Sequence, residues 1–199
     1  MKIKGLFISE KAQLKKWIYI TLFLFIAGVT AGAGYSVLLS AESDSSVVKY
    51  LNAYFCKIAV ECNYSEVLYN SLIEYTKLFI IIFLSSFVRP GIIIIEGTAV
   101  LKGIISGFTT ASFIKYYGTK GIFASLSSLP STVIYLPALL FFCAGSAVYC
   151  LNRYNREKKQ TKRYIVLAIC CLTTFCVASI SDTYITTTFM KLISSFFVD

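Results

Sequence analysis

The sequence predicts an all-α protein, a polytopic transmembrane helical bundle with about five spanning helices, and three observations support this fold class. Hydrophobic residues make up 57% of the 199 residues and charged residues 15%, a surplus that suggests a lipid environment. Several apolar stretches reach the roughly 20 residues that a helix needs to cross about 30 Å of hydrocarbon. These stretches do not alternate between apolar and polar residues, which argues against a transmembrane β-barrel.

Five spans are expected, at residues 17–39, 72–88, 92–114, 132–151 and 164–190. The second ends at a break formed by an arginine with Pro90 and Gly91, and the third follows at once. The apolar stretch that begins at Gly121 exceeds one straight crossing and contains Pro130 and Pro137. Because proline interrupts helices, we expect a short interfacial or re-entrant helix there, before the fourth span.

The largest segment between spans is an outer loop at residues 40–71, in one membrane domain that covers residues 1–199. Apolar residues recur in this loop at helical spacing and predict an outer amphipathic helix. The residues are Val47, Leu51, Tyr54, Phe55 and Ile58. The helix either lies on the membrane and its own bundle or offers a docking face to an extracytoplasmic partner.

Lysine and arginine are concentrated beside two span ends, which sets the expected orientation. Residues 1–16 contain five lysines and the loop at 152–163 contains six basic residues, so both are expected in the cytoplasm and the C-terminus outside. Lys115 and Lys120 count against this orientation. The net charge of +9 then indicates anchoring to anionic lipid headgroups and no nucleic-acid binding, because the basic residues flank spans. A signal peptide cleaved after Ala33 is the alternative for the first span.

The chain offers little material for catalysis. It contains no histidine, which excludes Ser-His and Cys-His nucleophile pairs and the commonest zinc ligand. Five of its seven cysteines lie in predicted spans without metal-binding spacing, and Cys56 and Cys62 of the outer loop are either free or joined in a disulfide. We therefore expect no enzyme activity, no cofactor and no metal site.

Ionisable residues inside spans are costly, and Glu96, Lys102 and Asp182 each need an explanation. We expect Lys102 and Asp182 to pair across two helices. Such a pair would be an internal staple or, alternatively, a polar site for an ion or substrate.

Small residues four apart favour close helix contacts in lipid. Gly28 and Gly32 form one such pair, and Gly103 and Gly107 form another. The pattern alone is compatible with packing inside the bundle and with a homo-oligomer.

A series of glycines and prolines extends this pattern along the chain. Its members are Lys102, Gly103, Gly107 and Phe108, then Gly118 and Gly121, then Pro130 and Pro137. In order and spacing the series resembles the stage II sporulation protein M family of integral membrane proteins, over most of the chain. The segment around Asp182 also resembles a family segment, which usually carries glutamate at that position. The chain departs from the family after Pro130, where Ser131 and Thr132 replace a histidine or a glutamine with asparagine.

The resemblance implies a role in sporulation, at the engulfment of the forespore by the mother-cell membrane. It implies a scaffold that holds the peptidoglycan-degrading stage II sporulation proteins D and P, with no catalytic residues of its own. The alternative is a subunit of a membrane transporter or channel, suggested by the ionisable residues inside spans and the proline-broken segment.

Overall fold

A computed structural model describes residues 2–38, 64–88, 90–127, 129–152, 158–186 and 188. This part of the chain is α-helical apart from turns and one π-helical turn, which confirms the all-α prediction. The helices are α1 (Lys2–Leu38), α3 (Tyr64–Ser85), α4 (Gly91–Ser127), α5 (Leu129–Leu151), α6 (Lys158–Ser181) and the π-helix η2 (Asp182–Thr186). The expected outer amphipathic helix, with Cys56 and Cys62, lies outside the described residues.

Each long helix contains a segment long and apolar enough to cross a membrane, as the five expected spans require. The segments are Gln13–Leu38, Tyr64–Ser85, Gly91–Thr119, Pro130–Leu151 and Thr161–Ile185. The second begins before the expected position, because polar residues in the first half of α3 lower its hydropathy without ending the helix.

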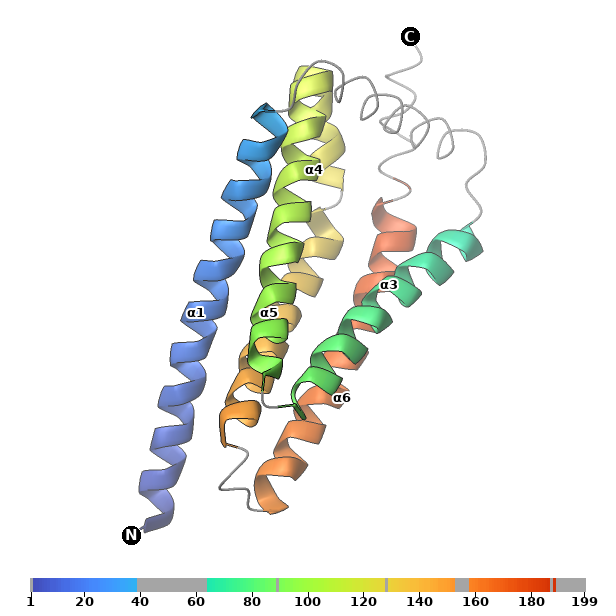
Figure 1. Cartoon of the computed structure of the whole chain (residues 1–199). Helices are drawn as coiled ribbons and strands as arrows, with labels where there is room; N and C mark the ends of the chain where they lie inside the picture. The colour runs from blue at the N-terminus through green and yellow to red at the C-terminus, as the bar shows by residue number, and fades with distance from the viewer. Residues whose placement is uncertain are drawn as a thin grey trace.

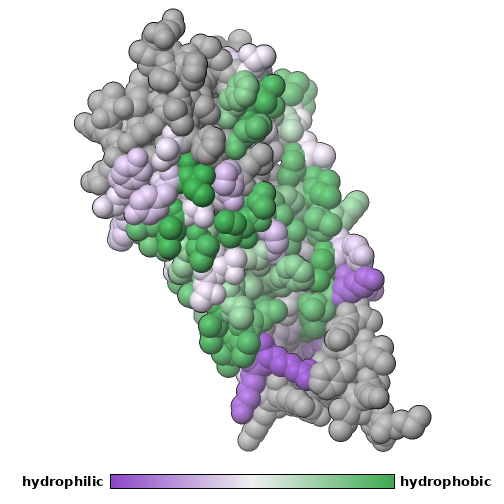
Figure 2. All heavy atoms as spheres, turned by 180° about the vertical axis from the view of Figure 1, so that it is seen from behind, coloured by the Kyte–Doolittle hydropathy of each residue, from purple (hydrophilic) through white to green (hydrophobic). Residues whose placement is uncertain are grey.

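The long helices α1, α3, α4, α5 and α6 alternate in direction in this order, so α1 and α4 run the same way (Figure 1). One end of the bundle carries exposed Lys15 and Lys16 of α1 and exposed Lys162 and Arg163 of α6, and we call it the basic end. Figure 2 shows apolar side chains across the middle of one face and the most hydrophilic ones toward this lower end. The opposite end, where α4 turns into α5, is called the hairpin end.

The two glycine pairs pack against each other, α1 on α4. Each of these glycines faces a backbone carbonyl of the other helix. That carbonyl belongs to the residue three positions before one of the other helix's two glycines. An added Cβ would meet these carbonyl oxygens: Val100 from Gly28, Ile104 from Gly32, Phe25 from Gly103 and Val29 from Gly107. The backbones of α1 and α4 approach so closely here that there is no room for a side chain between them. The two glycine pairs therefore serve packing within one chain.

Polar contacts keep α1 and α4 in one register over most of their length. The hydroxyl of Thr21 lies 3.0 Å from Oε1 of Glu96, and the hydroxyls of Ser36 and Ser112 are 2.9 Å apart. These partners differ in number by 75 and 76, and the glycine pairs between them follow the same offset. The two helices therefore pack in parallel without slipping.

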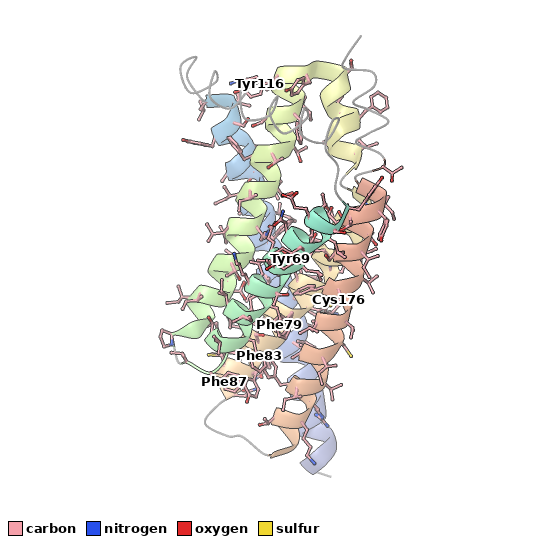
Figure 3. All side chains as sticks on the ribbon, turned by 90° about the vertical axis from the view of Figure 1, so that its right-hand side faces the viewer. Tyr69, Phe79, Phe83, Phe87, Tyr116 and Cys176 are labelled. Atoms are coloured by element: carbon pink, nitrogen blue, oxygen red, sulfur yellow. The ribbon has the colours of Figure 1, made fainter. Side chains whose placement is uncertain are left out.

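Aromatic rings join α3, α5 and α6. Phe142 of α5 is fully buried and stacks on Phe79 with ring centroids 4.9 Å apart. Tyr149 and Tyr164 stack at 4.1 Å nearer the basic end. Three rings on successive turns supply the α3 side of this core: Phe79, Phe83 and Phe87 (Figure 3). These interlocking rings fix the three helices against one another.

The chain reverses at the hairpin end through Gly118, whose φ of +57° favours glycine. Gly121 then passes so close to the carbonyl of Phe113 that it has no room for a Cβ. Residues 119–127 form the short helix expected before the fourth crossing. Pro130 lies in the first turn of α5, where its missing N–H costs little, and α5 continues through Pro137.

Candidate functional site

Polar side chains from α3, α4, α5 and η2 lie close together between the helices, with Glu74 at the bundle surface, and we call this set the polar cluster. It consists of Ser71, Glu74, Lys102, Ser131, Tyr135 and Asp182. Ser71 and Glu74 are three residues apart, and Ser131 and Tyr135 are four apart, so each pair shares one face of its own helix. The cluster thus brings together residues that are distant in the sequence.

Lys102 forms an ion pair with Glu74, through Nζ and Oε1. Glu74 lies 11 residues before the end of α3 at Ser85, and Lys102 lies 11 residues after the start of α4 at Gly91. At 1.5 Å per residue, each is about 17 Å from the turn between the two helices. An antiparallel helical hairpin therefore places the two charges level with each other. Nζ of Lys102 also lies 5.9 Å from the ring centroid of Tyr135, a favourable cation–π position.

Asp182 joins three elements at the hairpin end. Its Oδ2 accepts a hydrogen bond from Ser71 of α3 at 3.2 Å, and its Oδ1 accepts one from Ser131 of α5 at 3.0 Å. Asp182 opens the π-helical turn η2, in which Tyr184 stacks on Tyr64 at 6.0 Å. Single π-helical turns often occur at functional positions. Both carboxylate oxygens of Asp182 are thus engaged within the bundle.

The predicted pair between Lys102 and Asp182 is wrong. Lys102 binds Glu74, and Asp182 binds two serines. The two contacts lie one turn apart on α3: Ser71 binds Asp182, and Glu74, three residues later, supplies the carboxylate that binds Lys102. Glu74 was missed although it lies within the predicted span 72–88, where an acidic residue among apolar ones is the same signal that selected Glu96.

Three buried side-chain oxygens have no hydrogen-bond partner among the described residues, the hydroxyl of Ser179 in α6 and two others. One is Oε2 of Glu96, whose other oxygen contacts Thr21 between α1 and α4. The other is the hydroxyl of Tyr135 in the polar cluster. Within the described ranges, no group of three or more cysteine, aspartate or glutamate residues could hold a metal ion.

The residues that carry the family resemblance lie in three places. Lys102 and Asp182 belong to the polar cluster, and Pro130 starts the helix that carries Ser131 and Tyr135. Gly103 and Gly107 face α1, as does Phe108, whose ring is 6.1 Å from that of Tyr35. Gly118 and Gly121 form the turn at the hairpin end. Most of these residues therefore shape the bundle, and the two charged ones connect its helices.

Five apolar helices with charges paired between them define a polytopic α-helical membrane protein. The model of the stage II sporulation protein M family matches residues 21–187, from the first span to the π-helical turn. The chain belongs to this family and is a membrane protein of sporulation, as the resemblance predicted. No curated protein and no solved structure matches the chain significantly.

Replacing Asp182 with alanine is expected to lower the free energy of unfolding by about 1–2 kcal/mol, since two serine hydroxyls lose their acceptor. Asp182→Glu retains both acceptor oxygens and should lose less than half as much. Unfolding of the purified protein in mixed micelles measures both values. Equal stability of Asp182→Ala and the wild type would show that the carboxylate does not hold these helices.

Proposed function

We propose that the protein is a membrane scaffold required for engulfment, which recruits or positions peptidoglycan-degrading proteins in the mother-cell membrane. Membership of the stage II sporulation protein M family supports a sporulation role. Stage II sporulation proteins D and P are the partners that the resemblance implies. The scaffold itself needs no catalytic residues, only a rigid frame that presents surfaces to its partners.

The observation that carries this proposal is that Lys102 and Asp182, two charged residues of the spans, are each matched by groups of the same chain. Lys102 is paired with Glu74, and both oxygens of Asp182 accept serine hydroxyls. Charges engaged in this way connect helices, whereas a site for a transported ion would offer them to a ligand. The reciprocal glycine contacts and the aromatic core add to the rigidity that a scaffold needs.

The charge distribution supports an orientation with the basic end in the cytoplasm and the hairpin end outside. Lys15 and Lys16 lie at the same end as Lys162 and Arg163. Lys115, at the hairpin end, donates a hydrogen bond to the carbonyl of Ser36 at 3.2 Å in the last turn of α1. A lysine there has a local structural role, which reduces its weight against this orientation. Reporter fusions after residues 60 and 158 should respond on opposite sides of the membrane, and the same side would contradict the proposal.

Capture of the tagged full chain from sporulating cells tests the scaffold function. We expect both peptidoglycan-degrading proteins to be captured and engulfment to fail in a deletion strain. If the outer loop is the docking face, Tyr54→Ala and Phe55→Ala should reduce capture at least several-fold at equal protein levels. Val166→Ala, on an exposed position of α6, is the matched control and should leave capture unchanged. Absence of both proteins from the captured material, with normal engulfment in the deletion strain, would exclude the function.

A transporter or channel subunit is the second candidate, and the buried hydroxyl of Tyr135 favours it. This hydroxyl has no partner among the described residues, and the Tyr135 ring lies beside Lys102. A polar atom inside a membrane bundle that has no hydrogen-bond partner in the protein is a feature of sites that bind ligands. Ion flux in proteoliposomes that Asp182→Asn abolishes would support this candidate over the scaffold.

A further inference from the structure

The outward face of α3 has the sequence pattern of a coiled-coil seam. Five exposed residues follow one another at intervals of four, three, four and three: Asn70, Glu74, Lys77, Ile81 and Leu84. Residues at this spacing form one stripe along a helix and meet a second helix along its length. Figure 3, which faces the side of the bundle that carries α3 in Figure 1, shows α3 in front of the other helices.

Three of the seam residues are polar at depths where lipid cannot satisfy them. The side chain of Glu74 is 64% exposed although it lies about 17 Å from the basic end of α3. Lys77 is eight residues, or about 12 Å, from that end. Neither Asn70 nor Lys77 has a hydrogen bond or ion pair among the described residues. A polar face at such depth is expected to meet protein and not acyl chains.

The other outward faces differ from this one. At comparable depths α1, α4 and α6 expose large apolar side chains, which suit lipid: Phe23 and Ile26, Leu101 and Ile105, Val166 and Ile169. The glycine faces of α1 and α4 are already occupied by each other. Among the outward faces of the described helices, the α3 seam is therefore the one best suited to contact another protein.

We propose that the occupant of the α3 seam is a second copy of this chain. Two copies inserted with the same orientation place their α3 helices parallel about a two-fold axis along the membrane normal. The amide of Asn70 both donates and accepts, so it can pair with Asn70 of the second copy. In such a dimer Lys77 of one copy is about one helical turn from Glu74 of the other copy. Oε2 of Glu74 is available for this pair, because Lys102 binds Oε1.

The seam is complementary to itself in its apolar part as well. Ile81 and Leu84 continue the same stripe toward the basic end and supply the interlocking side chains of a parallel helix pair. A polar residue at one seam position fixes the register and the number of chains in such pairs. Asn70 meets this description, which favours a dimer in a single register. The inference concerns the state of the protein itself and holds whichever function it serves.

Photo-crosslinking of the full chain in lipid vesicles tests the proposal. A benzoylphenylalanine placed at Ile81 or Leu84 should give crosslinked dimers, whereas the same group at Phe23 or Val166 should not. Asn70→Ala and Lys77→Glu should each raise the dissociation constant about tenfold. Lys162→Glu makes the same charge change outside the seam and should leave the dissociation constant unchanged.

Lys77→Leu serves as the second variant, because Lys77 has no partner among the described residues and its loss should not unfold the bundle. It should also weaken the dimer by removing the ion pair to Glu74 of the second copy. A monomeric wild-type protein, or crosslinks as strong at Phe23 and Val166 as at the seam, would overturn the proposal. So would full dimerisation of Asn70→Ala, Lys77→Glu and Lys77→Leu.

Discussion

Replacement of Gly32 or Gly107 with alanine is expected to lower the free energy of unfolding by about 2–3 kcal/mol. A Cβ at either position would overlap a backbone carbonyl of the facing helix, that of Ile104 or that of Val29. A backbone carbonyl cannot rotate away as a side chain does, so α1 and α4 must separate to make room. That separation weakens the dispersion contacts along the whole helix pair, which drive helix association in lipid. Reversible unfolding in mixed micelles measures the effect.

Two other glycines on the same helices are matched controls. A Cβ at Gly34 of α1 or at Gly97 of α4 would meet no atom within 4 Å. Gly34→Ala and Gly97→Ala should therefore be neutral or raise stability slightly, because alanine favours the helix by up to about 1 kcal/mol. If Gly32→Ala unfolds as easily as Gly34→Ala, the parallel contact between α1 and α4 does not exist.

Replacement of Lys102 with leucine is expected to lower the free energy of unfolding by about 2 kcal/mol, less than for a fully buried pair because Glu74 is 64% exposed. The change leaves the carboxylate of Glu74 without its cation at a depth where water is scarce. Glu74→Leu should have a similar effect, because Lys102 is only 16% exposed and cannot easily reach water. Unfolding in mixed micelles compares the two variants with the wild type.

The double variant Glu74→Leu with Lys102→Leu distinguishes an ion pair from two independent contributions. With both charges removed, much of the lost stability should return, since well-packed apolar residues often replace a buried pair without loss. The exchanged pair, Glu74→Lys with Lys102→Glu, should recover part of it. Lys162→Leu removes an exposed charge at the basic end and should change stability little. Additive losses in the double variant would refute the pairing.

Apolar length alone was sufficient to find the helices, because a helix that crosses lipid must be mostly apolar and the bilayer fixes its minimum length. The proline-containing stretch also predicted the short helix before α5, which the structure places after Gly118. Helix ends were less predictable. The first part of α3 has polar residues such as Glu66 and Asn70, and the span predicted from hydropathy begins only after them, at residue 72.

The partners of charged residues could not be taken from hydropathy, but depth would have predicted one of them. Glu74 and Lys102 are equally far from the turn that joins α3 to α4, and Asp182 is near the opposite end of its span. Counting residues from each turn therefore favours Glu74 as the partner of Lys102. The serines that bind Asp182 were not predictable, because hydroxyl groups are common in membrane helices and carry no such constraint.

The constant offset of 75 residues between partners on α1 and α4 has a consequence for biosynthesis. At translation rates of about 5–20 residues per second, α1 leaves the ribosome roughly 4–15 s before the α4 segment that it contacts. During this interval α3 is synthesised and inserted, and the glycines of α1 do not yet have α4 to pack against. Completion of the bundle is therefore a late event, in which the first helix to be made docks onto the third after its arrival.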